Sequence, residues 1–182
     1  MSSRKSMRGF VILLLFLIGL LMLLFSKVFR KKLTTSELDQ LIIKKLIAAG
    51  LSQPTAEMWA AVARHESADY TSNLATNHNN FFGMGYGTGK GADYKVTARD
   101  GDHDMEFAGY NSPGNGLNDL VLYLQDNRYP KSFATLAELI RFMKSKGYFT
   151  DDEARYRNGV VAAKYRAGFT FPVGFGGATS SW

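Results

Sequence analysis

Residues 58–84 read MWAAVARHESADYTSNLATNHNNFFGM, and the rest of the chain can be understood around this segment. It begins with the apolar run Met58–Ala63, which predicts a buried helix, and the polar sequence from residue 67 onward ends that helix near Glu66. Glu66 therefore lies where a core meets a polar region. Such a carboxyl can serve as a general acid, because apolar neighbours disfavour its charged form and keep it protonated near neutral pH. The other interpretation is a solvated Glu at a helix C-terminus, and periodicity alone favours that one.

The end of the same segment combines amide side chains with flat apolar ones. Asn79 and Asn80 precede Phe81, Phe82 and Gly83, and a glycine lets the backbone approach a ligand closely. Amide donors, backbone groups and aromatic faces suit a neutral sugar that carries an acetamido group. An Asn-rich loop that two phenylalanines attach to the core fits equally well, so the residues alone leave both interpretations open.

Apolar residues at helical spacing predict the surrounding elements. The helical pattern recurs over five segments, which are residues 34–50, 53–66, 116–125, 135–146 and 151–166. A hairpin is predicted to pair residues 94–97 with residues 105–108 around Asp100-Gly101-Asp102. The sequence therefore predicts an α+β fold, mainly helical with a small β-hairpin lobe.

The first part of the chain has a different character. Residues 9–26 carry no charge and consist mostly of large apolar side chains, a length close to the roughly 20 residues that a bilayer helix needs. We expect one transmembrane helix here rather than a cleaved signal peptide, because no small-residue cleavage site follows it. The expected division is a basic flank and membrane anchor over 1–32, a domain over 33–167, and a Gly- and aromatic-rich tail over 168–182.

Charge and composition exclude several classes of function. The formal net charge is +6, but seven of the 22 Lys and Arg residues precede Leu33, where there is no Asp or Glu. The remaining chain has a net charge of −1, so a basic nucleic-acid-binding face is not supported. There is no cysteine, and His65-Glu66 lacks the second histidine of a zinc motif because Asp69 takes its place. We expect neither a metal nor a cofactor.

An ordered series of motifs resembles glycoside hydrolase family 73. The series comprises Glu66-Ser67-Ala68, Asn79 to Met84, Phe107 to Ser112, Asp119, Asn127-Arg128-Tyr129, Lys146-Gly147-Tyr148 and Tyr156. The family consists of peptidoglycan endo-β-N-acetylglucosaminidases with a lysozyme-like fold. The resemblance, over about residues 34–164, implies that Glu66 is the general acid.

The resemblance also implies the other residues of the site. It places the segment Asn79 to Gly83, including Asn80 and Phe82, along a sugar cleft. Tyr156 matches a tyrosine of the family's cleft, and Tyr110 matches the tyrosine that ends the second hairpin strand and is expected to help bind the sugar.

Two positions depart from the family pattern. The family's glycine after Glu-Ser is Ala68 here, which could alter the turn that leaves the helix. The family's second carboxylate lies in the hairpin, and five acids compete for that role: Asp93, Asp100, Asp102, Asp104 and Glu106. We expect Asp100 or Asp102 to approach the cleft, both too far from Glu66 for the roughly 5 Å separation of retaining enzymes.

These features predict a membrane-anchored peptidoglycan hydrolase that cleaves β-1,4 bonds of the glycan strand. Its partners would be peptidoglycan and, through residues 9–26, the lipid bilayer. Two alternatives remain open: a lytic transglycosylase that uses the same single acid, and a peptidoglycan-binding module without turnover. The expected location of the domain is periplasmic or otherwise extracytoplasmic, or the membrane of a lipid-containing virion.

Overall fold

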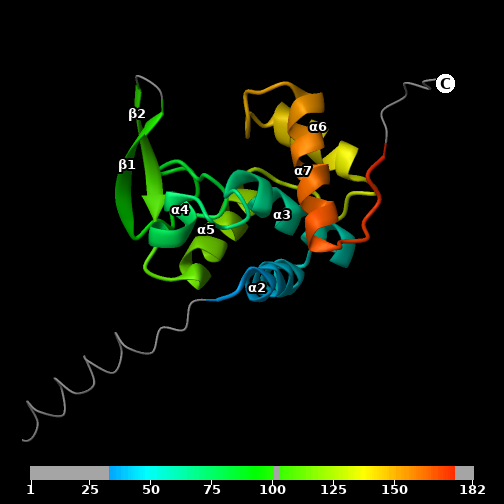
Figure 1. The fold of residues 1–182 in the computed structure, drawn as a ribbon, viewed down its shortest axis with the longest axis horizontal. Helices are drawn as coiled ribbons and strands as arrows, with labels where there is room; N and C mark the ends of the chain where they lie inside the picture. The colour runs from blue at the N-terminus through cyan, green and yellow to red at the C-terminus, as the bar shows by residue number, and fades with distance from the viewer. Residues whose placement is uncertain (1–32, 101–102, 175–182) are drawn as a thin grey trace, which may run out of the picture. The chain divides into compact units, whose positions relative to one another are not determined.

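The computed structural model describes residues 33–100 and 103–174, and the side chains of Asp100 and His103 are outside the described part. The chain divides into two units, residues 1–34 and 35–182. All described helices and strands belong to the second unit, and Figure 1 labels them. Their bounds are α2 Thr35–Ala48, α3 Gln53–Glu66, α4 Asn73–His78, β1 Tyr94–Asp100, β2 His103–Gly109, α5 Pro113–Asp126, α6 Leu136–Ser145 and α7 Glu153–Ala167. The predicted mainly helical α+β fold with a small hairpin is confirmed.

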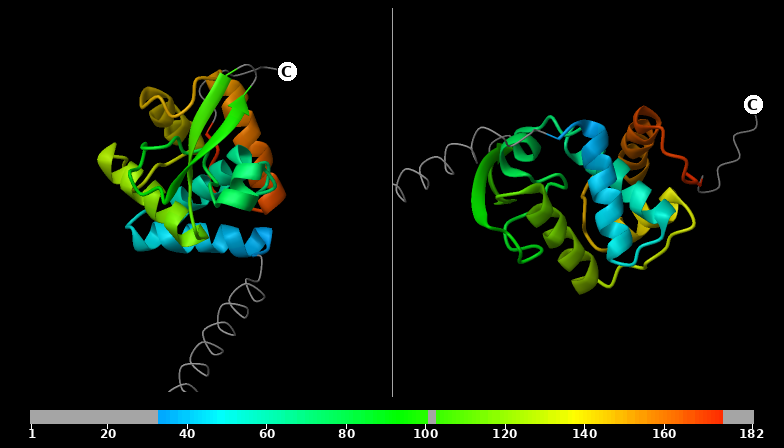
Figure 2. Two further views of the ribbon diagram at one scale, coloured as in Figure 1. Left: turned by 90° about the vertical axis from the view of Figure 1, so that its left-hand side faces the viewer. Right: turned by 90° about the horizontal axis from the view of Figure 1, so that it is seen from below.

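Helix α3 forms the centre of this unit. Its residues from Met58 to Ala63 are all fully buried, because an apolar run this dense presents apolar surface in every direction. It packs against α2, α6 and α7. The hairpin and α7 lie on opposite sides of α3 in Figures 1 and 2. This packing therefore fixes the position of α3 and of Glu66 at its C-terminal end.

The two strands form an antiparallel hairpin in the register Tyr94↔Gly109 to Asp100↔His103. The predicted hairpin is confirmed, and its strands extend to both sides of the tip residues 101–102, which lie outside the described part. On the edge of β2 that does not pair with β1, the backbone N–H of Ala108 donates to the carbonyl of Met84 at 2.9 Å. This contact fixes the segment after Gly83 against the hairpin.

Local capping explains where the structure and the sequence prediction differ. Helix α5 begins at Pro113, three residues before the predicted start, because Ser112 caps it by accepting a hydrogen bond from the N–H of Asn115. Helix α4 lies in a region predicted to be a loop, and Ser72 caps it in the same way. Only Ala75 of α4 is buried, so the helix has no hydrophobic period that the sequence could show.

The beginning of the predicted tail packs on the helical unit. The backbone N–H groups of Leu136 and Ala137, at the start of α6, donate to the carbonyls of Pro172 and Val173, each at 2.9 Å. Phe171 is 2% exposed. These contacts satisfy two of the N–H groups that a helix leaves unpaired at its first turn.

Within residues 33–100 and 103–174, no helix is long and apolar enough to span a bilayer. The predicted transmembrane segment, residues 9–26, lies outside the described residues.

Candidate active site

A sharp left-handed turn places Glu66 at the end of α3. Ala68, Asp69 and Tyr70 have φ angles of 50°, 54° and 67°, which is the left-handed region. Ser67 ties this turn to the helix, since its hydroxyl donates to the carbonyl of Ala63 at 2.5 Å and accepts from the N–H of Tyr70 at 3.0 Å. The chain therefore leaves α3 immediately after the carboxyl.

The Glu66 carboxyl is partly enclosed by other parts of the chain. The hydroxyl of Tyr156, on α7, donates a hydrogen bond to Oε1 of Glu66. A Cβ atom on Gly83 would lie 3.7 Å from Oε2 of Glu66, so the backbone of Gly83 borders the carboxyl. Burial raises the pKa of Glu66, and the hydrogen bond from Tyr156 acts in the opposite direction. A raised pKa favours the protonated form that a general acid needs.

Two rings hold the phenol of Tyr156. Phe149 stacks on it with ring centroids 3.9 Å apart and planes 3° apart, and His65 meets it edge to face at 4.9 Å. Burial raises the pKa of Tyr156, as do the charge of Glu66 and the hydrogen bond to it. Tyr156 therefore keeps its proton and acts as a donor to Glu66.

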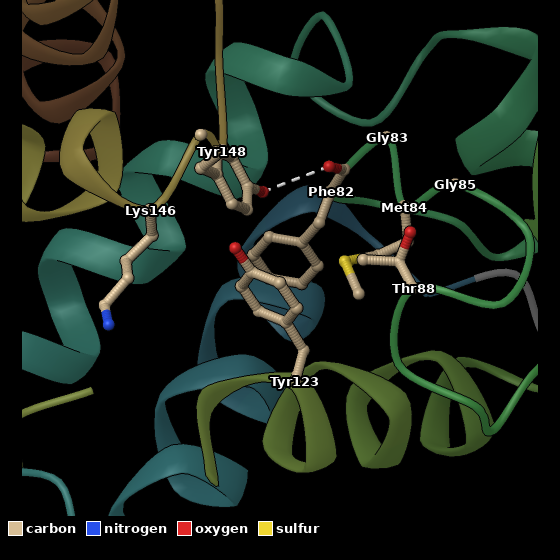
Figure 3. A pocket seen from close by; sticks show the side chains of 9 residues that line it. Phe82, Gly83, Met84, Gly85, Thr88, Tyr123, Lys146 and Tyr148 are labelled. Carbon is tan, nitrogen blue, oxygen red and sulfur yellow. Dashed lines mark hydrogen bonds between the residues drawn. The ribbon is translucent and has the colours of Figure 1, made fainter. Parts of the chain in front are cut away.

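Beside Gly83 there is a pocket of about 240 Å³ (Figure 3). Its lining residues are Phe82, Gly83, Met84, Gly85, Thr88, Tyr123, Lys146, Gly147 and Tyr148. The hydroxyl of Tyr148 donates to the carbonyl of Phe82 at 3.0 Å, which joins two sides of the pocket. Gly83 belongs to this pocket and also borders Glu66, so the pocket and the carboxyl share one wall.

Asn80 supports this wall from behind. Its amide nitrogen donates to the carbonyls of Met84 and Ala108, each at 2.9 Å, and its oxygen accepts from the N–H of Met84 at 2.9 Å. Asn80 is 1% exposed, so its amide is used to shape the chain around the pocket rather than to reach a ligand.

Asn79 and Tyr110 lie away from the pocket lining. Asn79 donates through its amide to the carbonyl of Tyr110 at 2.8 Å. Tyr110, which is 1% exposed, donates its hydroxyl to Asp119 at 2.6 Å, and Asp119 also accepts from the N–H of Gly91 at 2.6 Å. Of the predicted sugar-binding residues, the structure thus brings Phe82 and Gly83 to the pocket, and it uses Asn79, Asn80 and Tyr110 to anchor the loops around it.

The predicted second carboxylates fall at the tip of the hairpin. The side chains of Asp100 and Asp102 lie outside the described part, so their approach to the cleft stays a prediction. The strand register pairs Asp104 with Arg99 and Glu106 with Thr97, on the sheet face opposite to that of the buried Val96.

Two of the other acids of this region, Glu106 and Asp93, have partners in the fold: each is paired or hydrogen-bonded within or beside the hairpin. Glu106 pairs with Lys95 at 2.7 Å. Asp93 accepts hydrogen bonds from the N–H of Asn111 at 2.7 Å and from the amide of Asn115 at 2.8 Å.

Several residues of the site carry no individual signal in the sequence. Tyr148 belongs to a motif of the family resemblance, but its position in the pocket depends on the loop after α6. Phe149 lies in the loop between α6 and α7, Tyr123 on α5 and His65 on α3, and the packing of these segments brings them to the site. Their spacing along the chain does not indicate this packing.

Comparisons with known proteins give the family and the fold of the chain. No curated protein is similar enough in sequence to match the chain. Among solved structures, the catalytic domain of the autolysin Auto from Listeria monocytogenes matches with a TM-score of 0.52 and 16% sequence identity, over 79% of this chain and 90% of that one. At this identity the match shows a shared fold. The glucosaminidase family model, described as mannosyl-glycoprotein endo-beta-N-acetylglucosaminidase, matches residues 47–167, which include Glu66, the hairpin and Tyr156. The chain therefore belongs to the glucosaminidase family and is a glycoside hydrolase.

Proposed function

We propose that the protein cleaves β-1,4 glycosidic bonds of peptidoglycan with Glu66 as the general acid. The observation that carries this proposal is the Glu66 carboxyl itself, which has a raised pKa, a hydrogen-bond donor in Tyr156 and a shared wall with the pocket. Peptidoglycan as the substrate is supported by the family and by the similarity in fold to a domain of an autolysin.

In this mechanism, Glu66 transfers its proton to the glycosidic oxygen while the bond from that oxygen to the anomeric carbon breaks. The carboxylate that forms is stabilised by the hydroxyl of Tyr156. A nucleophile on the other side of the sugar then attacks the anomeric carbon, which carries the developing positive charge. That nucleophile is a water activated by a second carboxylate, an enzyme carboxylate, or the acetamido group of the substrate.

Asp100 or Asp102 is our proposed source of the second carboxylate, which would act through an intervening water or after a motion of the hairpin. The contacts of Glu106 with Lys95 and of Asp93 with Asn111 support this choice, because those two carboxylates already have partners in the fold. Alanine at each of the five hairpin acids in turn tests this. Loss of hydrolysis in only the Asp100→Ala or Asp102→Ala variant supports the assignment, and normal hydrolysis in all five variants contradicts it.

A lytic transglycosylase is the second candidate, and one observation favours it. The Glu66 carboxyl is held by the hydroxyl of Tyr156 and bordered by the backbone of Gly83, and a single acid held in this way is all that the reaction needs. In that reaction the 6-hydroxyl of muramic acid attacks its own anomeric carbon. Mass spectrometry of the released fragments separates the two, because hydrolysis leaves reducing ends and transglycosylation leaves anhydro-muramic acid ends.

We further propose that residues 9–26 anchor the protein, with the N-terminus in the cytoplasm and the domain outside the membrane. The support is the uncharged apolar sequence of this segment and the location of the proposed substrate. Protease added to spheroplasts should digest the domain. Complete protection would contradict this orientation, and digestion only after disruption of virus particles would place the protein in a virion membrane.

The test of the activity compares the full-length protein with its Glu66→Gln variant on purified peptidoglycan. Gln keeps the shape of the side chain but has no proton to transfer, so turnover should fall by about 10²–10⁴-fold while binding persists. Turnover by the variant at the original rate would rule out Glu66 as the acid. Binding without turnover by the unaltered protein would instead show a peptidoglycan-binding module.

A further inference from the structure

The imidazole of His65 lies beside the residue that hydrogen-bonds Glu66. Its ring meets the ring of Tyr156 edge to face, with centroids 4.9 Å apart and planes at 89°. His65 directly precedes Glu66 on α3, and successive side chains of a helix point about 100° apart. The end of α3 therefore carries the acid and the imidazole side by side, and both contact Tyr156 of α7.

The backbone of α7 lies directly against this imidazole. A Cβ atom on Gly159 would lie 2.2 Å from Cε1 of His65, so the ring occupies the space that a side chain at position 159 would fill. Tyr156 and Gly159 are three residues apart on α7 and share one face of it. The imidazole thus sets how far α7 lies from α3 at the level of Tyr156.

The surroundings of His65 favour a neutral imidazole, which contacts Tyr156 by packing rather than by charge. Burial lowers the pKa of His65 and the positive charge of Arg166 lowers it further, whereas Asp151 raises it. Arg166 itself is paired with Asp69 at 2.8 Å. The imidazole is therefore neutral at neutral pH and can pack closely against the phenol of Tyr156.

We propose that His65 is a positioning residue, which holds the ring of Tyr156 where its hydroxyl can donate to Glu66. This inference rests on the proposed function, in which Glu66 is the acid. It goes beyond that function because it assigns the placement of Tyr156 to a residue that is neither donor nor acceptor in the Glu66–Tyr156 hydrogen bond.

The first test measures kcat and KM of the full-length protein on purified peptidoglycan. His65→Ala should lower kcat by about tenfold to a hundredfold, as expected for a displaced catalytic group, with a much smaller change in KM. His65→Phe, which restores a ring, should recover most of kcat. In a Tyr156→Phe background, His65→Ala should have no further effect on kcat, because the hydrogen bond that it positions is already absent.

His78→Ala is the matched control. His78 also meets a tyrosine ring, that of Tyr94, with centroids 5.9 Å apart and planes at 66°, but it lies at the end of α4. Its loss removes a ring contact elsewhere in the fold, together with the hydrogen bond between Nδ1 of His78 and the hydroxyl of Tyr94 at 3.2 Å, and should leave kcat unchanged. A decrease in kcat of the same size in His78→Ala, or an equal effect of His65→Ala with and without Tyr156, would overturn the proposal.

A second measurement does not depend on turnover. The pKa of Glu66 can be followed by NMR of its ¹³C-labelled carboxyl in the full-length protein. Because the hydrogen bond from Tyr156 lowers that pKa, both Tyr156→Phe and His65→Ala should raise it. If Tyr156→Phe raises the pKa of Glu66 and His65→Ala does not, the proposal fails even when the enzyme is active.

The titration also separates this proposal from the proposed function. If the unaltered protein does not cleave peptidoglycan, the proposed function fails, and the titration still decides the role of His65. Should His65→Ala not fold, His65→Leu, which fills the space without a ring, replaces it in both measurements.

Discussion

The hydroxyl of Tyr156 donates a hydrogen bond to the carboxyl of Glu66 across 90 positions of the sequence. The contact joins the end of α3 to the first turns of α7. The pKa of Glu66 is subject to two opposing effects: burial favours the protonated carboxyl, and the hydrogen bond favours the carboxylate. A general acid needs both, the first before it transfers its proton and the second afterwards.

Tyr156→Phe should therefore change both the rate and its pH dependence. A hydrogen bond to a charged group contributes about 1.5–3 kcal/mol, so kcat should fall by about tenfold to a hundredfold. The pKa of Glu66 should rise further, because the carboxylate loses its donor while burial remains. The decline in activity at high pH, where Glu66 loses its proton, should accordingly move to higher pH. A pH–kcat profile measures both effects, and an unmoved alkaline limb would show that Tyr156 does not act on the ionisation of Glu66.

Glu66→Gln should stabilise the fold near neutral pH while it removes activity. The folded-state pKa of Glu66 is raised above its ordinary value of 4.5, so the folded state holds its proton more tightly than the unfolded state. The contribution of Glu66 to stability is thus complete below pH 4.5 and is lost as pH rises through the raised value. Urea unfolding at several pH values should show Glu66→Gln gaining stability over the original protein as pH rises. A constant difference across pH would contradict the raised pKa.

The sequence was sufficient to predict the elements with strong periodic patterns. Helix α3 was predictable because its apolar run is dense and ends abruptly at Glu66, and the hairpin because alternating strands flank a turn sequence at residues 100–102. Glu66 could be proposed as an acid from its position between core and polar segment, whereas Tyr156 came only from the family resemblance.

The remaining features depend on contacts between elements. The approach of Gly159 to His65 follows from how α7 packs on α3, and the stacking of Phe149 on Tyr156 follows from the course of the loop between α6 and α7; no local pattern encodes either. The left-handed turn at Ala68–Tyr70 was also not predictable, because alanine and tyrosine both disfavour that conformation. Tertiary contacts impose it, including the hydrogen bond from Tyr70 to Asp39 at 2.7 Å.

Ala68→Gly should stabilise the protein. Ala68 has a φ of 50°, a left-handed conformation that costs an L-residue about 1 kcal/mol and costs glycine almost nothing. Part of this gain is offset because glycine adds freedom to the unfolded chain, so a net increase of about 0.5 kcal/mol is expected. Ala68 is exposed, so no packing is lost. Thermal unfolding measures the effect, and Ala75→Gly, within the right-handed helix α4, is the control that should destabilise.

Arg64→Met should destabilise the end of α3 strongly. The guanidinium of Arg64 binds the buried carboxylate of Asp39, with Nε to Oδ1 at 2.9 Å and Nη2 to Oδ2 at 2.5 Å. Removal of Arg64 leaves the carboxylate of Asp39 buried without an opposite charge, with the hydroxyl of Tyr70 still donating to it, and breaking such a buried pair costs about 3–5 kcal/mol. The double variant Asp39→Leu/Arg64→Met removes both charges and should recover much of that loss in urea unfolding. If the single and double variants are equally unstable, packing of the arginine rather than its charge is responsible.

Gly159→Ala should destabilise the protein although it improves helix propensity. Within an isolated helix, alanine is favoured over glycine by about 1 kcal/mol. In α7, however, the added Cβ would lie 2.2 Å from Cε1 and 2.6 Å from Nδ1 of His65, so α7 or the imidazole must move. That movement should also lower activity, because Tyr156 lies on the same helix face.

The effect of Gly159→Ala on stability should change sign when the imidazole is absent. In a His65→Ala background, the added Cβ meets no ring, and Gly159→Ala should stabilise the protein. Urea unfolding of the four proteins in this double-mutant cycle measures the reversal, and destabilisation of equal size in both backgrounds would show that the clash is not with His65.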